Sequence, residues 1–309
     1  LTSSLTLTGN TGGSNTYDVI LLTGSTAGDF TLNGDNDLLY AFSGLAVSSG
    51  NTLTIDPGVV VKFLSTSSNL AVVGTLNAVG TATDPIIFTS IKDDTYGGDT
   101  NNDGTTTTPA AGDWHYFEIY GSSATANLDY VTIQYGGYTG TSYDYGMFWI
   151  DDNAASVTVD NSILQESQYY TVQIDTGSTS TISNSTISNT AGRYGIYITG
   201  GTTTLDTNAI SATSSYGVYA NNASPTLTSN TITGSTYGVV VSGTSSAPTI
   251  TDNTFTGNTD GLYVASLSST SPTIITDNTF TGNTYPIWMG TLTSSLTLTG
   301  NTGGSNTYD

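Results

Sequence analysis

The sequence predicts an all-β fold, a parallel β-helix in which each coil takes about 22–25 residues. Two observations lead to this prediction. Similar stretches follow one another through the C-terminal half, beginning at Thr204, Thr226, Thr249 and Thr273, and each contains short segments of alternating apolar and polar residues. A helical periodicity is almost absent, and the abundant Gly, Thr and Asn residues disfavour helices.

An asparagine recurs once per coil, between two short strands. Because equivalent strands of successive coils lie about 4.8 Å apart, we expect these side-chain amides to bond from coil to coil as a ladder, a structural role. The spacings are 24, 23, 22, 23, 25 and 23 residues, and the positions are Asn161, Ser185 with Asn184 beside it, Asn208, Asn230, Asn253, Asn278 and Asn301.

Two apolar positions per coil are expected to point inward and to stack on their equivalents in neighbouring coils. The first comes two residues after the ladder position, in Ile163, Ile187, Ile210, Ile232, Phe255 and Phe280. The second lies later in the coil, in Val172, Ile196, Val218, Val239, Leu262 and Ile287. The first pattern fails at Gly303.

The N-terminal half follows the period more loosely, with an excursion over about residues 92–112. Its runs "LTIDPGVVVKF", "GTLNAVGTATDPIIFTS", "DDTYGGDTNNDG" and "LDYVTIQYGG" resemble the right-handed parallel β-helix repeats of large secreted bacterial surface proteins, within the pectin-lyase-like superfamily. The resemblance covers about residues 50–290. It implies a right-handed solenoid but no single function, because that superfamily contains lyases, hydrolases, adhesins and structural proteins.

Residues 1–18 and 292–309 are identical. We interpret the chain as one solenoid domain, a 291-residue period plus an 18-residue overlap, although duplication of a terminal segment is the alternative. The overlap keeps the phase of the coils, because Leu298, Asn301 and Tyr308 each follow their counterparts Ile275, Asn278 and Tyr285 by 23 residues. We therefore expect the shared segment (residues 1–18, which recur as 292–309) to form one coil, or rung, of a solenoid that continues across copies. Each copy would then cap its neighbour.

The charge and composition exclude several partners. With three basic residues and a net charge of −21, the chain cannot hold nucleic acid or an anionic membrane by counter-charge. No apolar run approaches the roughly 18 residues that a membrane-spanning helix needs. The absence of cysteine excludes disulfides and thiolate metal sites.

The run "DTNNDG" is the sharpest chemical motif, and it matches the opening of a calcium-binding loop. Asp99, Asn101 and Asp103 would supply oxygens, while Gly104 allows the sharp turn. A bidentate glutamate would be expected where this sequence has Ala110, so Asp113, or Asp93 and Asp94, would have to complete the shell of a structural calcium ion. Two further acidic pairs, Asp35 with Asp37 and Asp151 with Asp152, are also candidates.

No enzyme is predicted. Lys62, Lys92, Arg193 and His115 are scattered over different coils, whereas β-helix lyases and hydrolases need a base or an acid beside clustered carboxylates. Lys62 lies in an apolar strand and is expected to direct its amine outward, and Lys92 is expected to pair with the adjacent Asp93.

Tyr138, Tyr143 and Tyr145 lie in a tyrosine-rich loop that is difficult to bury. We expect this loop to make lateral contacts between fibres or contacts with glycans.

These observations predict a structural subunit or tandem repeat of a filament that is extracellular or at the cell surface. Its partners would be copies of itself, end to end and side by side, with polysaccharide as another candidate. The alternatives are an adhesin or glycan-binding stalk, a polysaccharide lyase or hydrolase remnant, and an ice-binding protein that uses its threonine rows. The sequence leaves open whether successive copies are one covalent chain or separate subunits.

Overall fold

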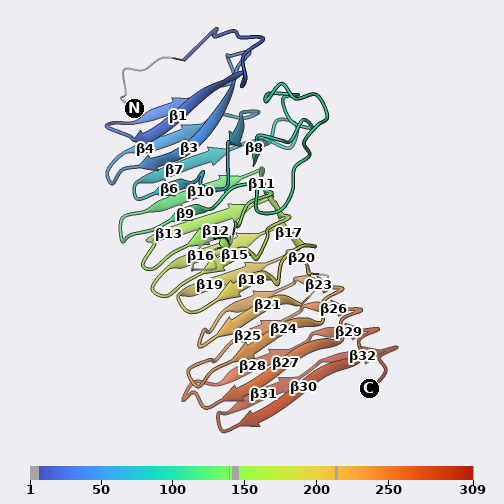
Figure 1. Ribbon diagram of the computed structural model, residues 1–309. Helices are drawn as coiled ribbons and strands as arrows, with labels where there is room; N and C mark the ends of the chain where they lie inside the picture. The colour runs from blue at the N-terminus through green and yellow to red at the C-terminus, as the bar shows by residue number, and fades with distance from the viewer. Residues whose placement is uncertain (1–6, 139, 141–145, 213–214, 309) are drawn as a thin grey trace.

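The computed structural model describes residues 7–138, 140, 146–212 and 215–308. In these residues the chain forms 32 β-strands, which pair in parallel and stack into one elongated solenoid of about a dozen turns (Figure 1). The predicted fold class is thereby confirmed. Within the described ranges no helix is long and apolar enough to cross a membrane.

Each coil contributes strands to three faces, which we name A, B and C in chain order. Face A is an 11-stranded sheet made of β2 (Phe30–Leu32), β4 (Thr52–Ile55), β7 (Thr75–Val79), β10 (Thr125–Asp129), β13 (Ser156–Asp160), β16 (Thr179–Ser183), β19 (Thr202–Asp206), β22 (Thr226–Thr228), β25 (Thr249–Thr251), β28 (Thr273–Thr276) and β31 (Leu296–Thr299). Face B contains β5 (Val60–Phe63), β8 (Ile86–Ser90), β11 (Val131–Gln134), β14 (Ile163–Gln165), β17 (Thr186–Asn189), β20 (Ala209–Ala212), β23 (Thr231–Thr233), β26 (Thr254–Thr256), β29 (Thr279–Thr281) and β32 (Thr302–Gly304). Face C contains β6 (Leu70–Val72), β9 (Phe117–Ile119), β12 (Gly146–Ile150), β15 (Tyr170–Ile174), β18 (Tyr194–Ile198), β21 (Tyr216–Asn221), β24 (Tyr237–Ser242), β27 (Asp260–Leu267) and β30 (Tyr285–Leu292).

Two long strands, β1 (Val19–Ser25) and β3 (Leu39–Val47), join faces B and C at the N-terminal end. The first part of β3 pairs with β5 and its last part pairs with β6, so one strand covers two faces. The excursion leaves the solenoid between β8 and β9 and lies beside its N-terminal coils (Figure 1).

Columns of apolar side chains fill the interior because the two-residue alternation of each strand keeps the same register in the next coil. On face A, one column runs in register from Leu32 through Leu128, Leu205 and Ile275 to Leu298. Faces B and C supply the columns that include Phe280 and Leu262, which are 1% and 0% exposed.

The predicted inward positions are confirmed, except for Ile163 at the start of the first predicted column. Ile163 is 41% exposed, and Leu164 takes the inward place because it pairs with Ile187. The residue before each ladder position turns the corner with a positive φ, and Asn161 (46°) and Asn184 (48°) are such corner residues. Asparagine tolerates this left-handed backbone, so it is favoured at the corner as well as in the ladder. The predicted register was therefore one residue early at Asn161.

Candidate functional site

An asparagine ladder runs along the corner between faces A and B. In each step the backbone N–H and the side-chain Nδ2 of one asparagine donate to Oδ1 of the next, at 2.9–3.1 Å. Its members are Asn208, Asn230, Asn253, Asn278 and Asn301. Ser185 and Ser162 extend the column. The backbone N–H of Ser185 donates to Oδ1 of Asn208, and the hydroxyls of Ser185 and Ser162 accept from the backbone N–H groups of Ser162 and Val131. Asn161 is not part of it, and its amide donates to Asp129 and Asp160 instead.

A second ladder, which the sequence analysis missed, follows the corner between faces B and C. Asn258 donates to Asn283 and Asn283 donates to Asn306, again from both nitrogens to one Oδ1. The signal was present in the sequence, because these three residues recur five positions after Asn253, Asn278 and Asn301. The two ladders thus satisfy buried polar groups at both ends of β26, β29 and β32.

The shared segment occurs at both ends of the described solenoid, and its two occurrences show different neighbours. In the second occurrence Asn301 accepts from Asn278 of the preceding coil, at 2.9 Å from Nδ2. In the first occurrence the equivalent residue, Asn10, donates to Oδ1 of Asn36 in the following coil, at 3.1 Å from N and 2.7 Å from Nδ2. The Nδ2 of Asn36 in turn donates to the carbonyl of Leu7, three residues before Asn10. Ladder asparagines make the same bond: Asn278 donates to the carbonyl three residues before Asn253, and Asn301 to the one three residues before Asn278. One segment thus has a ladder partner on each side.

The two occurrences also share backbone features at the corners. Gly9 and Gly300 have φ values of 65° and 69°, and Ser14 and Ser305 have values of 63° and 57°. The strands differ, because β32 pairs with β29 in the second occurrence, whereas the equivalent residues 11–13 of the first occurrence form no strand. The segment therefore has the same corner conformations in both places, but residues 302–304 alone form a paired strand of face B.

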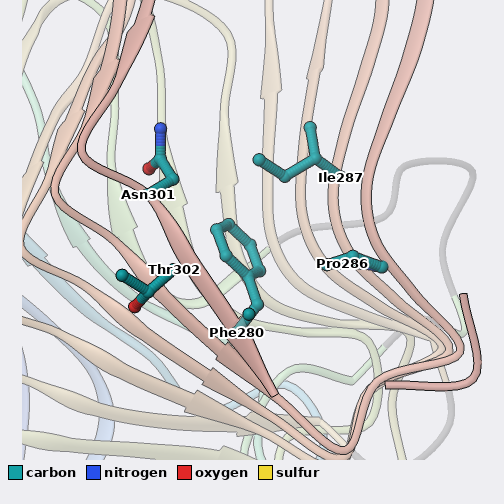
Figure 2. A pocket seen from close by; sticks show the side chains of 6 residues that line it. Phe280, Pro286, Ile287, Asn301 and Thr302 are labelled. Atoms are coloured by element: carbon teal, nitrogen blue, oxygen red, sulfur yellow. The ribbon is translucent and has the colours of Figure 1, made fainter. Parts of the chain in front are cut away.

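A pocket of about 340 Å³ lies at the last coil, between the strands of faces B and C (Figure 2). The Phe280 ring and the Ile287 side chain line it, with Asn301 and Thr302 at its edge. Gly303 follows Phe280 in the inward column of face B, so no side chain covers the ring from that coil. The Phe280 ring is nevertheless only 1% exposed, so the pocket adjoins a ring that the solenoid already buries.

The excursion is organised around the ammonium group of Lys62. The neighbours Val61 and Phe63 belong to the core, so Lys62 points outward as expected, but the excursion covers it completely (0% exposed). Its Nζ donates to the carbonyl oxygens of Asp93 and Gly98 and to Oγ1 of Thr100, at 2.8–2.9 Å. Burial lowers the pKa of Lys62, against the attraction of nearby carboxylates.

Two of the six proposed calcium ligands are engaged elsewhere. Asp93 is 1% exposed, and its carboxylate accepts from Thr89, Thr95 and Gln134. Asp113 pairs with Lys92 at 2.6 Å, so the expected pair between Lys92 and Asp93 is wrong. Both carboxylates hold the excursion to the solenoid.

The other four residues also lie in the excursion, but the carboxylate oxygens of Asp94, Asp99 and Asp103 are not all within 4.8 Å of one another, and Asp103 accepts from Asn101 and Thr107. Asp99 accepts from the backbone N–H groups of Asp103 and Gly104, which closes the turn. Oδ1 of Asp94 and Oδ1 of Asn101 are both buried with no hydrogen-bond partner. Burial and the charges of Asp99 and Asp103 raise the pKa of Asp94. Unpartnered buried oxygens beside like charges fit a hard cation, which prefers oxygen ligands.

The same excursion contacts the first occurrence of the shared segment. The side chain of Asn102 donates to the carbonyl of Asn15 at 2.7 Å and to Oδ2 of Asp18 at 3.0 Å. The backbone N–H of Asp18 donates to the carbonyl of Thr100 at 2.9 Å. The excursion therefore fixes the last residues of the segment just before β1 begins.

A second acidic group lies at the end of the face C strands. Carboxylate oxygens of Asp151, Asp152 and Asp175 lie within 4.8 Å of one another. Trp149 donates to Asp175 at 2.7 Å, so part of this charge is satisfied by the protein. Glu118 beside them is 9% exposed, and burial together with Asp151 raises its pKa to about 7.

Tyrosines form a stacked column on the outer surface of face C. Tyr194, Tyr216 and Tyr237 occupy equivalent positions, with ring centroids 4.7 and 5.0 Å apart and nearly parallel planes. Asp260 interrupts the column before Tyr285. Because the rings face one another, the column presents mainly ring edges and hydroxyl groups to solvent.

The tyrosine-rich loop is described only in part. Tyr138 lies beside His115, with ring centroids 6.5 Å apart, while Tyr143 and Tyr145 lie outside the described residues. The remaining basic side chain, Arg193, lies over the Tyr169 ring on face C. The basic residues and His115 thus have separate surroundings. Lys62 donates to carbonyl and hydroxyl oxygens and Lys92 pairs with Asp113, whereas Arg193 and His115 lie beside tyrosine rings.

Comparison with known proteins identifies one family. The family described as "Right handed beta helix region" matches residues 145–302, about half of the chain. No curated protein and no solved structure matches the chain. The matched range covers the coils in which the first asparagine ladder is most regular.

Proposed function

Because this chain belongs to the right-handed β-helix family, whose fold serves both enzymes and structural proteins, we propose its function from its own residues. We propose that it is one period of a structural filament, in which copies follow one another along the solenoid axis. In this arrangement residues 292–309 of one copy are residues 1–18 of the next, and Val19 follows directly. An extracellular or cell-surface location is part of the proposal, on the resemblance to secreted surface proteins.

One observation carries the proposal: the shared segment has a ladder partner on both sides. Merging its two occurrences gives Asn278, then Asn301 (equivalent to Asn10), then Asn36, without a break in the ladder. About twelve coils at 4.8 Å give each period a length of about 58 Å. A filament of this kind leaves no strand edge unpaired at the joints, which favours stacking over aggregation.

Calcium binding in the excursion is the second part of the proposal. Asp94, Asp99, Asn101 and Asp103 would hold the ion, and the two buried, unpartnered oxygens support this choice. Because Asn102 between these residues binds Asp18, an ordered excursion would also hold the shared segment in place. Calcium would thus stiffen the joint and neutralise part of a charge of −21 per chain.

The filament is tested by the mass of the fully denatured native polypeptide, together with electron microscopy of the native material. A chain many times 31.9 kDa, in fibres with an axial repeat of about 58 Å, would establish a covalent array. A chain near one period that still forms such fibres would establish subunits that dock end to end. Monomeric particles without an axial repeat would refute the proposal.

An adhesin or glycan-binding stalk is the second candidate. Trp288 is 48% exposed and Tyr285 is 40% exposed on the outer surface of face C, where aromatic groups can contact sugars. Binding to a glycan array that is lost on replacing Trp288 by alanine would favour this function. Lateral contacts between fibres through Tyr138 would instead appear as loss of bundling in a Tyr138→Ser variant.

A further inference from the structure

Strand β1 is out of step with the asparagine ladder beside it. At the corner between faces A and B, Asn10 bonds to Asn36, and these residues are 26 positions apart. Further along the same coil, Val19 of β1 pairs with Leu39 of β3, only 20 positions apart. The chain from Asn10 to β1 is therefore six residues longer than the matching part of the next coil. Residues 11–18, which contain this excess, form no strand.

The second occurrence of the shared segment takes a different path. There Asn306 accepts from the ladder between faces B and C, and the chain then reaches the start of face C. The backbone N–H of Tyr308 donates to the carbonyl of Thr284 at 3.1 Å, as that of Tyr285 donates to Thr259. The rings of Tyr308 and Tyr285 stack with centroids 4.9 Å apart. In the proposed filament the following residues would thus run along β30 on face C, whereas β1 begins on face B.

The sequence of β1 matches the second path. The runs "NTDGLYV" from Asn258 and "NTYPIWM" from Asn283 lead into face C, and their fifth and seventh residues pack inward. The run "NTYDVIL" from Asn15 has the same pattern, which assigns Val19 and Leu21 to the inward positions of face C. In the present position of β1, however, Leu21 is 50% exposed. An inward residue of the repeat thus lies on the outside.

A shift of β1 by six residues along β3 removes both discrepancies. Val19 would then face Leu45 and Leu21 would face Val47, two fully buried residues of face C. Each of these pairs is 26 positions apart, the same step as in the ladder beside them. The shift also exchanges the two sides of β1, because the inward residues of β3 are even-numbered on face B and odd-numbered on face C. Four consecutive apolar residues from Val19 allow the strand to bury either side.

We infer that β1 of a following copy leaves face B and pairs with β30 of the copy before it, with Val19 on Ile287 and Leu21 on Met289. The inference rests on the proposed filament and specifies how its joint closes on face C. Ile287 and Met289 pack against the core but are only partly buried, so β1 would complete their burial. The outer edge of β30 is therefore a docking surface for a second copy of this chain.

The test introduces one cysteine into a chain that has none, so that thiol labelling reports a single position. The protein is a two-copy chain in which Asp309 is followed directly by Val19 of the second copy. Leu21→Cys in the second copy should react with a maleimide at least about tenfold more slowly than Leu21→Cys in the first copy, because a buried thiol reacts only when its coil opens. The first-copy variant is the matched control, since β1 of that copy has no copy before it.

Ile20→Cys examines the opposite side of the strand. In the first copy Ile20 packs against the core, so its cysteine should react slowly. In the second copy it would lie beside the exposed Trp288 on the outer surface and should react faster. Because this variant retains Leu21, its result does not depend on whether the joint tolerates Leu21→Cys.

Amide hydrogen exchange in β31 of the first copy reports stacking separately, because β2 of the second copy would cover β31 in either position of β1. Slower exchange there than in the single 309-residue chain, together with the reversed labelling of positions 20 and 21, supports the shift. If exchange in β31 is the same in both chains, continuous stacking is wrong and the shift fails with it. If β31 is protected but each cysteine reacts equally fast in the two copies, the filament stands and the shift is refuted.

Discussion

Replacing Asn253 by alanine should destabilise its part of the solenoid by about 2–6 kcal/mol. Asn253 is fully buried, and its Oδ1 accepts from both nitrogens of Asn230 at 2.9 Å, while its Nδ2 donates to the carbonyl of Leu227 at 2.9 Å. Alanine would leave the N–H of Asn230 and the carbonyl of Leu227 buried without partners. Each such group costs about 1–3 kcal/mol, which gives the range stated.

Serine is the matched variant, because the ladder column already contains it. In Ser185 the hydroxyl accepts from the backbone N–H of Ser162 at 3.0 Å. Asn253→Ser should therefore keep an acceptor for Asn230 and lose the Nδ2 bonds to Leu227 and Asn278. Oδ1 of Asn278 still accepts from the backbone N–H of residue 253, so the cost is that of the Leu227 carbonyl, about 1–3 kcal/mol. Asn127→Ala, at an exposed strand position on face A, controls for loss of an asparagine elsewhere.

Amide hydrogen exchange along the coils is the appropriate assay, since stability in a solenoid is local and unfolding need not be two-state. We expect faster exchange in β22, β23, β25 and β26, in the order alanine, serine, wild type. Equal effects of Asn253→Ala and Asn253→Ser, or effects no larger than that of Asn127→Ala, would refute the reasoning that hydrogen-bond satisfaction gives the ladder its stability.

Three further predictions concern the excursion and face C. Lys62→Met should leave the carbonyl groups around Lys62 without their donor. The excursion of this variant should then be cleaved by a protease near Gly104, whereas that of the wild type should resist. Equal resistance of the two proteins would contradict the role given to the amine. Calcium should protect the excursion from the same cleavage, and Asp99→Asn with Asp103→Asn should raise the calcium concentration required at least about tenfold, as measured by titration calorimetry. Burial raises the pKa of Glu118 to about 7, so the folded protein binds this proton more tightly than the unfolded chain does. The free energy of unfolding should therefore fall by up to about 3 kcal/mol as the pH rises from about 4.5 to 7. Denaturation measured across this pH range should show the fall in the wild type and not in Glu118→Gln.

The fold could be predicted because each coil repeats the same physical problem. A column such as Ile210, Ile232, Phe255 and Phe280 requires an apolar residue at one place in every turn, and a single sequence that contains many turns displays this requirement repeatedly. The ladder was readable for the same reason. Its first member, Asn161, was misplaced because serine can replace asparagine in the column while asparagine also suits the corner before it.

The excursion was predicted over about residues 92–112, but its contacts could not be, because they occur once in the described coils and join residues remote in sequence. The amine of Lys62 meets acceptors 31–38 residues away, and no local pattern indicates that a lysine in an apolar strand will order a distant polar loop. Likewise, spacing alone assigned Asp93 and Asp113 to calcium, although partners from neighbouring strands hold both. Local motifs identify oxygen donors, but tertiary contacts decide which of them remain available.

The shared segment has to satisfy two neighbours, and this double requirement constrains its residues more than a position within the period is constrained. Asn301 must accept from Asn278, and the same residue as Asn10 must donate to Asn36. Gly303 must lie against Phe280, and the same residue as Gly12 must leave space for Leu38. A change that suits one neighbour alone would weaken the joint with the other, so Asn301 and Gly303 are each constrained from both sides of the joint.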